Sequence, residues 1–482
     1  MPEPLPLRRM FGPGFVMTGA GLASAEFILW PYVTSRVGPV FLWVAVVAVL
    51  TQFFVNTEVA RYTLATGQSA ATGFSRLWKP WALIFAAFAL LANAWPAWAV
   101  GSATAATLAY DMGEGAVRPL SILLLVVIGF VLTLSPVAYR TLEKVQFFKV
   151  GVVLLFSGIS LFVGINPWDW RDLPAATLAG VTRPLWILEQ AETSGRLPEG
   201  LSALTIVGLV AFAGAGGLLN LAQSNWMREK GFGMAAYAPV LPPALPREAE
   251  EEAAECAPVS TAPVYTFPQN EENLSLWHVW WKNTNREQFF GFFVVGSIAI
   301  FLFSMLAYAS LYNFEVGPDF DYVLVQGAVL SGTIGPWFGT SFWVAGAVAL
   351  LAANLGLVDY TGRLSADALR AGPLAGSGFW SEGRIYAATV WGLVVFGCLA
   401  ILFTSAGPVD LLLASAVPGV LAMSVYCLLL IRLNRKALPN AIKLTGPRLG
   451  AMIWAAMLFT FLALLLVLDA LLRLSANLPG GG

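Results

Sequence analysis

The chain has 482 residues, of which 58% are hydrophobic and only 11% are charged. A soluble domain carries roughly 25% charged residues, so this composition excludes an ordinary soluble protein. The net charge of −1 gives no sign of a nucleic-acid partner. The three cysteines are widely separated and indicate neither a disulfide framework nor a thiolate metal site. The short N-terminal segment has no small-residue cleavage site, so we expect no removable signal peptide.

Eleven apolar segments are long enough to cross a bilayer, whose hydrocarbon core needs about 20 helical residues. They predict an all-α polytopic membrane protein. The expected spans are residues 12–33, 39–60, 81–109, 119–138, 147–165, 202–226, 287–313, 340–361, 384–404, 408–431 and 449–472.

The basic residues predict the orientation of these spans. If the N-terminus is cytoplasmic, 21 of the 27 Lys and Arg residues fall on the inner side, as membrane proteins prefer. We therefore expect a multi-pass protein of the cell membrane with a cytoplasmic N-terminus and an external C-terminus. Residues 166–200 are expected as an external loop whose tryptophans lie at the interface. Residues 231–285 contain a run of Pro, Ala and Glu and are expected as a disordered cytoplasmic linker.

A short motif occurs twice along the chain. The triplet Gly19-Ala20-Gly21 of the first span returns as Gly214-Ala215-Gly216 in the sixth span. Because the second copy lies five spans after the first, an odd number, it enters the membrane from the opposite side, as in an inverted-topology repeat. We expect one transporter domain, 1–482, with a first repeat at 1–165, a second repeat at 201–431 and an extra helix at 449–472.

The repeated triplets are candidate helix breaks, at Gly19, Gly21, Gly214 and Gly216. Glycine lowers the cost of unwinding a helix, and unwound carbonyls can bind a cation where they line a cavity. Close packing of helices is the alternative reason for small residues here. Glu26 follows the first triplet, and an acid at the bilayer centre costs at least about 2.5–3.5 kcal/mol. It is expected to face a pathway, pair with a charge or bind an ion, unless it is neutral and hydrogen-bonded.

The eighth span carries a second polar group on its inner half, formed by Asn354, Asp359, Thr361 and Arg363. Asp359 and Arg363 are one helical turn apart and can pair. This group is expected as a gate or a coupling-ion site, although the pair could simply satisfy itself in an inner vestibule. In the third span, Pro96 is expected to kink the helix.

Several of these features together resemble the Nramp metal-ion transporters. They are "GPGF" at 12–15, "GGLLNLAQSNW" at 216–226, the pattern of span eight and the eleven spans. The resemblance implies a LeuT-type fold, that is, a 5+5 inverted repeat plus one extra helix. Within it, the family's helix-one motif Asp-Pro-Gly-Asn is replaced by residues 23–26, and its helix-six motif Met-Pro-His by residues 217–219. The family's helix-three acids fall at Trp95 and Trp98, so the chain is expected as a divergent member with weak or absent proton coupling.

The replaced motifs leave only oxygen ligands. The expected binding set combines side chains with unwound carbonyls, namely Ala23, Ser24, Glu26, Gly217, Asn220 and Gln223. Such a site suits Mg²⁺, Ca²⁺, Mn²⁺ or a monovalent cation rather than a soft metal.

The sequence thus predicts a secondary transporter that moves a hard or borderline divalent cation by alternating access, with Mg²⁺ or Mn²⁺ preferred over Fe²⁺. Two alternatives stay open. One is a small organic solute transporter coupled to Na⁺ or H⁺, and the other is a sensor or scaffold that no longer transports. We expect no enzymatic activity and no cofactor. The expected partners are an inorganic cation and the lipid bilayer, without nucleic acid, and the oligomeric state is open, a monomer included.

Overall fold

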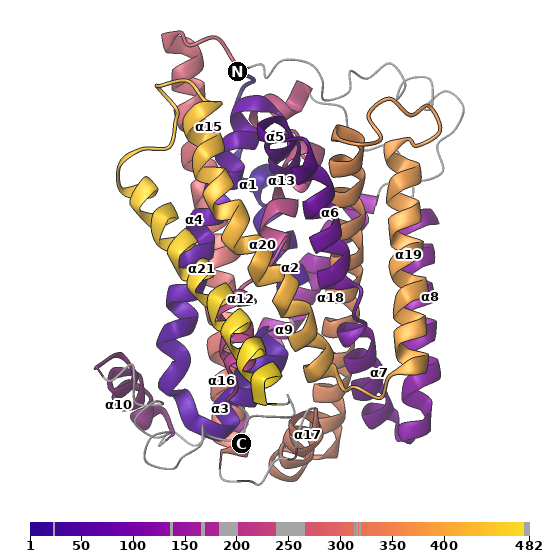
Figure 1. Ribbon diagram of the computed structural model, residues 1–482. Helices are drawn as coiled ribbons and strands as arrows, with labels where there is room; N and C mark the ends of the chain where they lie inside the picture. The colour runs from indigo at the N-terminus through magenta and orange to yellow at the C-terminus, as the bar shows by residue number, and fades with distance from the viewer. Residues whose placement is uncertain are drawn as a thin grey trace.

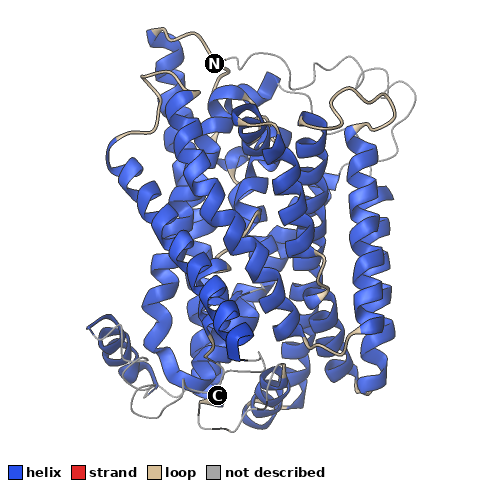
Figure 2. Ribbon diagram, viewed as in Figure 1, coloured by secondary structure: helices blue, strands red, loops and turns tan. Residues whose placement is uncertain are grey.

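The computed structural model of the chain describes residues 1–22, 25–134, 138–164, 169–182, 201–237, 266–312, 314, 317 and 320–476. These residues form helices joined by loops and include no strand (Figure 2). The expected all-α membrane fold is confirmed. Met1 lies at one end of the elongated bundle, which we call the N-terminal face, and α10 (Asp169–Thr182) and α17 (Asp321–Thr333) lie at the opposite face (Figure 1).

The helices of the first half follow the expected spans. Their bounds are α1 Leu7–Met10, α2 Pro13–Gly21, η1 Ala25–Leu29, α3 Trp30–Val37, η2 Gly38–Phe41, α4 Leu42–Thr66, α5 Ala70–Leu77, α6 Pro80–Asn93, α7 Ala97–Tyr110, η3 Glu114–Ala116, α8 Val117–Leu134 and α9 Ala138–Gly164. The third span is divided between α6 and α7 just before Pro96, as its proline predicts.

The helices of the second half contain longer spans than expected. Their bounds are α12 Ala203–Ala211, α13 Leu219–Glu229, η4 Gly233–Tyr237, α15 Glu271–Gln288, η5 Phe289–Val294, α16 Val295–Leu311, α18 Pro336–Ala371, α19 Glu382–Phe403, α20 Pro408–Lys436 and α21 Gly446–Ala476.

Nine helical stretches of the described chain are long and apolar enough to cross a membrane. The stretch Pro13–Thr66 contains the first two expected spans. The sixth expected span is interrupted between α12 and α13, so each of its two parts is too short to qualify alone. The helices are therefore consistent with the eleven spans expected from the sequence.

The expected disordered linker at 231–285 needs correction at both ends. Residues 233–237 form η4, and residues 271–285 belong to the first part of α15. Trp277 and Trp280 of α15 are buried, and Trp280 Nε1 donates a 2.9 Å hydrogen bond to the Pro2 carbonyl. These tryptophans give α15 an apolar face to bury, which the acidic run between them and η4 lacks. Residues 238–265 lie outside the described part.

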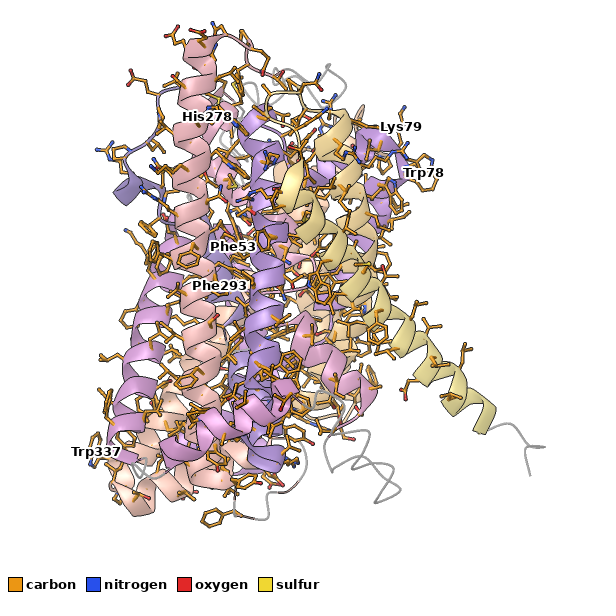
Figure 3. The ribbon with its side chains drawn as sticks, turned by 90° about the vertical axis from the view of Figure 1, so that its left-hand side faces the viewer. Phe53, Trp78, Lys79, His278, Phe293 and Trp337 are labelled. Carbon is orange, nitrogen blue, oxygen red and sulfur yellow. The ribbon has the colours of Figure 1, made fainter. Side chains whose placement is uncertain are left out.

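The outer surface of the bundle shows a belt of exposed apolar side chains between the two faces. Phe53 and Phe293 lie close together at mid-height, whereas Trp78, Lys79 and His278 lie toward the N-terminal face and Trp337 toward the opposite face (Figure 3). Trp78 toward one face and Trp337 toward the other, with Phe53 and Phe293 between them, fit a protein whose long axis crosses the bilayer.

Candidate functional site

Two interrupted helices meet in the middle of the bundle. The first break separates α2 from the π-helical η1, and Leu22 at its start has an extended backbone. The second break, residues 212–218, separates α12 from α13. Glu26 Oε1 accepts a 2.7 Å hydrogen bond from the Gly214 amide, so the carboxylate of one broken helix binds the backbone of the other. Both residues are buried.

Glycine is required at the second break by its backbone conformation. Gly214, Gly216 and Gly217 have φ values of 84°, 75° and 58°, where a residue with a Cβ is strained. At Gly216, a Cβ would lie only 1.7 Å from the Ala211 carbonyl oxygen. The second triplet therefore lies within an unwound segment.

The first triplet has a different role from the one expected. Gly19 and Gly21 are helical residues in the last turn of α2, and the break follows them. A Cβ on Gly21 would lie 2.6 Å from the Gly214 carbonyl oxygen, and one on Gly19 would lie 2.7 Å from Gln146 Cβ. Expecting both within the break is thus wrong, because they serve the close approach of α2 to its neighbours. Ala23 and Ser24 lie outside the described residues.

The amide side chains of α13 carry buried oxygen atoms. Asn220 Nδ2 donates to the Tyr426 hydroxyl at 3.2 Å and lies 3.5 Å from Gln52 Oε1. Gln223 Nε2 lies 3.8 Å from the Met227 sulfur. Asn220 Oδ1 and Gln223 Oε1 are buried and have no hydrogen-bond partner among the described residues. Two unsatisfied amide oxygens one helical turn apart can accept a cation or water.

Helix α20 contributes groups to the second break that the sequence did not point to. The Gly217 amide donates a 3.2 Å hydrogen bond to the Met423 sulfur, and the Gly217 carbonyl accepts one of 2.9 Å from the Tyr426 hydroxyl. The expected oxygen-only environment is therefore incomplete, since a thioether lies at the break. The Met423 sulfur already accepts the hydrogen bond of the Gly217 amide.

A side chain of α4 binds the last backbone carbonyls of α12, the helix that precedes the second break. Gln52 Nε2 lies 3.3 Å from the Val210 carbonyl and 3.2 Å from the Ala211 carbonyl, at the C-terminal end of α12. The last carbonyls of a helix have no partner within it, so an interrupted helix needs such a donor.

A buried lysine lies beside the first break. Lys149 of α9 is 1% exposed, and its Nζ donates a 2.6 Å hydrogen bond to the Gly19 carbonyl in the last turn of α2. Under the eleven-span topology, Lys149 is one of the 21 Lys and Arg residues on the inner side. Its position inside an apolar stretch, Leu142–Phe162, is the signal in the sequence that points to a buried lysine.

The polar group of span eight lies nearer the N-terminal face and is separate from the breaks. Arg363 Nε bonds Asp359 Oδ2 at 2.8 Å, and Arg363 Nη1 bonds Glu229 Oε1 of α13 at 2.8 Å. The Tyr386 hydroxyl donates to Asp359 Oδ1 at 2.8 Å. The expected pair is thus formed, and it joins α18 to α13 and α19.

The other two residues expected in this group differ from the pair. The Thr361 hydroxyl bonds its own helix at the Leu357 carbonyl, 2.7 Å away. Asn354 is buried, and its Nδ2 has no hydrogen-bond partner in the described part of the chain. Among the described residues, no hydrogen bond joins either side chain to the Asp359–Arg363 pair.

More ion pairs close the bundle around this level. Asp367 binds Arg228 at 3.0 Å and the Thr72 hydroxyl at 3.1 Å, which links α18 to α13 and α5. Lys230 binds Glu143 of α9. The Glu287 carboxylate accepts a 2.7 Å hydrogen bond from the Gly14 amide at the start of α2. These contacts hold the broken helices against the rest of the bundle at the N-terminal face.

The third span offers no acid at the expected level. Trp98 is buried, and Trp95 packs edge-on against Phe396 with ring centroids 6.0 Å apart. Within the described residues, no three His, Cys, Asp or Glu side chains gather as a metal cluster. Any metal in the breaks would therefore depend on one carboxylate together with amide and carbonyl oxygens.

Comparison with known proteins gives a result at the level of the fold. No family model matches the sequence, and no curated protein matches it. A crystal structure of a mutant of the Eremococcus coleocola manganese transporter superposes with a TM-score of 0.70 and 14% identity, covering 98% of this chain and 89% of that one. The same transporter in complex with an aromatic bis-isothiourea compound gives 0.67 and 14%, covering 100% and 91%.

A more distant structure supports the same architecture. A nucleobase-cation-symport-1 family transporter in a closed conformation has a TM-score of 0.50 and 14% identity, covering 97% of this chain and 93% of that one. The chain therefore shares the fold of these transporters, which confirms the LeuT-type fold that the sequence predicted.

Proposed function

We propose that the chain is a secondary transporter that moves a divalent cation across the cell membrane by alternating access. One observation carries this proposal. Glu26, a fully buried carboxylate, lies where two helices of an inverted pair are both interrupted. Discontinuous helices that meet at mid-membrane are where transporters of this architecture bind their cargo.

The binding set we propose contains Glu26 as the charged ligand, with Asn220 and Gln223 as neutral oxygen ligands. The carbonyls of Ala23 and Gly217 and the hydroxyl of Ser24 complete it. Asn220 Oδ1 and Gln223 Oε1 support this role, because a buried amide oxygen without a partner is unfavourable until it finds one.

The same ligands suggest the kind of ion. Carboxylate and amide oxygens suit hard or borderline cations, so we propose Mg²⁺ or Mn²⁺ in preference to Fe²⁺. The Met423 sulfur could favour a softer metal, but it already accepts the Gly217 amide. A metal that took the sulfur would leave that buried N–H unsatisfied, which costs about 1–3 kcal/mol.

The ion pair of Asp359 and Arg363 is proposed as an inner gate. Because it joins three helices on the side of the N-terminal face, a passage toward that face requires it to break. We propose that this face is cytoplasmic, since most Lys and Arg residues lie there under the eleven-span topology. The two repeats, 1–165 and 201–431, would then move against each other, with 449–472 as the added helix.

A small organic solute is the second candidate cargo, and Lys149 favours it. An ammonium at the end of α2, together with the Glu26 carboxylate that follows the break, would offer a zwitterion such as an amino acid one group of each sign. Against this, Lys149 Nζ already binds the Gly19 carbonyl. A sensor or scaffold remains the third candidate.

Uptake of Mn²⁺ by proteoliposomes tests the proposal. Wild-type protein should accumulate Mn²⁺, and Glu26→Gln should lower the initial rate by at least about tenfold, equivalent to 1.4 kcal/mol of lost stabilisation. Glu114→Gln, which changes an exposed acid, is the matched control and should behave as wild type. Solute accumulation on a Na⁺ or H⁺ gradient without Mn²⁺ uptake would favour the second candidate, and no transport of either kind would favour the third.

A further inference from the structure

We propose that Gln52 of α4 and Tyr426 of α20 are positioning residues that hold the Asn220 amide in one orientation and leave only its oxygen available to the cargo. The inference rests on the proposed transport function, in which Asn220 is a neutral oxygen ligand. All three side chains are fully buried. Neither Gln52 nor Tyr426 belongs to the proposed binding set, so both act through Asn220.

The orientation of an amide decides which kind of cargo it can bind. One end of the Asn220 side chain is an oxygen that only accepts hydrogen bonds, and the other is an NH₂ group that only donates them. The oxygen attracts a cation, whereas the NH₂ group repels it and attracts a carboxylate. A side chain free to rotate by half a turn could therefore bind cargo of either sign.

The Tyr426 hydroxyl fixes one side of the amide. Its single proton is donated to the Gly217 carbonyl at 2.9 Å. Toward Asn220 Nδ2, which lies 3.2 Å away, the phenolic oxygen can therefore only accept. A reversed amide would place its oxygen against an oxygen that has no proton left to donate. The Gly217 carbonyl thus sets the direction of both hydrogen bonds.

The Gln52 side chain fixes the other side. Its Nε2 lies 3.3 Å from the Val210 carbonyl and 3.2 Å from the Ala211 carbonyl. Carbonyls have no proton to donate, so the Gln52 amide cannot reverse without losing both bonds. Its Oε1 therefore lies on the side of Asn220, 3.5 Å from Nδ2. Both protons of Asn220 Nδ2 now have an acceptor, and Oδ1 is the end without a hydrogen-bond partner among the described residues.

The direction of this network comes from the second break itself. It ends on one side at the Ala211 carbonyl, just before the break, and on the other at the Gly217 carbonyl, within it. Backbone carbonyls cannot exchange donor and acceptor roles, so Asn220 presents a hydrogen-bond acceptor as long as the break keeps its shape. A cation finds a ligand in that oxygen, whereas a cargo carboxylate finds no donor in the amide. The network therefore favours the cation over the zwitterion as cargo.

Binding and uptake of Mn²⁺ by the full chain test this role. Tyr426→Phe and Gln52→Leu each remove one acceptor and let the Asn220 amide rotate. Each should raise the Mn²⁺ dissociation constant, measured by titration calorimetry in detergent, about three- to tenfold, the effect of one lost hydrogen bond. The maximal uptake rate at saturating Mn²⁺ should stay within about twofold. Tyr62→Phe and Gln326→Leu, buried residues whose side chains bond elsewhere, are the matched controls and should bind as wild type.

A double-variant comparison separates positioning from a general effect on packing. Asn220→Leu removes the amide, so adding Tyr426→Phe or Gln52→Leu to it should weaken Mn²⁺ binding no further. The two second changes release different backbone carbonyls and share only the Asn220 amide. The loss of both effects would therefore identify that amide as their common target.

Three results would overturn the inference. They are further weakening of equal size in the Asn220→Leu background, unchanged dissociation constants in the folded single variants, and a lower maximal rate at an unchanged dissociation constant. If Gln52→Leu does not fold, Tyr426→Phe, which removes a single oxygen atom, decides the test alone. Wild-type protein that binds no Mn²⁺ would instead refute the proposed function, and the inference with it.

Discussion

The Glu26 carboxylate accepts a 2.7 Å hydrogen bond from the Gly214 amide across the two interrupted helices. This contact explains how an acid is tolerated in an apolar segment. The Gly214 amide can bind Glu26 because the chain is unwound between α12 and α13. It is unwound there because Gly214, Gly216 and Gly217 adopt positive φ. One carboxylate oxygen of the acid that follows the first copy of the motif is thus bound by a glycine of the second copy.

The close approach of the two broken helices predicts the effect of Gly21→Ala. A Cβ would lie 2.6 Å from the Gly214 carbonyl and 2.7 Å from Ala215 Cα, and both are backbone atoms that cannot rotate away. We expect a loss of about 1–3 kcal/mol of stability, as for other overpacked sites. Thermal unfolding in detergent measures it. Gly392→Ala, where a Cβ meets nothing within 4 Å, is the control, and equal midpoints for the two variants would contradict the account.

The sequence predicted the membrane fold because long apolar segments and the distribution of basic residues determine the spans almost alone. It also pointed to Glu26 and to the second break, since a buried acid and a glycine triplet are visible without any tertiary contact. The role of Gly21 could not be predicted, because it depends on the backbone of Gly214, distant in sequence but adjacent in space.

Lys149 and Met423 were missed for a related reason. A lysine near the end of an expected span resembles an interfacial anchor, and only the longer extent of α9 places it inside the bundle. Met423 is one of many apolar residues of α20, and its contact with Gly217 requires the helices to be assembled. The helix α15 was missed because an acidic, proline-rich run precedes it and dominates the composition of 231–285.

Metal selectivity should not depend on the thioether. The Met423 sulfur already accepts the hydrogen bond of the Gly217 amide. We therefore expect Cd²⁺ to compete with labelled Mn²⁺ at most about tenfold more strongly than Mg²⁺ does, a difference of 1.4 kcal/mol. Met423→Leu should leave the ratio of the two inhibition constants unchanged. Block by Cd²⁺ at far lower concentration, lost in Met423→Leu, would show that the sulfur is a ligand.

The proposed inner gate predicts the effect of Asp359→Asn. The variant removes the charge that faces Arg363 Nε and weakens the bond from the Tyr386 hydroxyl, while Glu229 still binds the guanidinium. We expect a loss of about 2–4 kcal/mol of stability, near the lower range for a broken buried pair. Asp410→Asn, an exposed acid at the start of α20, is the control. A midpoint temperature like that of the control would show that the pair does not hold the helices together.

Orientation can be tested at two labelled positions of the surface. His278 lies toward the N-terminal face and Trp337 toward the opposite face, and both side chains are exposed (Figure 3). With Cys256 replaced by serine, a cysteine introduced by Trp337→Cys should react with an impermeant maleimide in intact cells. One introduced by His278→Cys should react only after permeabilisation. The reverse pattern would invert the topology.

The location of the bound ion is the most direct test of the central claim, that the paired breaks around Glu26 hold the transported cation. Crystals grown with Mn²⁺ and measured at its absorption edge would locate the metal by anomalous scattering. We expect a peak within about 2.5 Å of a Glu26 carboxylate oxygen and of an amide oxygen of Asn220 or Gln223, the outer range for oxygen ligands of hard cations. A metal peak found only among the acids of the N-terminal face, such as Asp367 and Glu229, with none at Glu26, would contradict it.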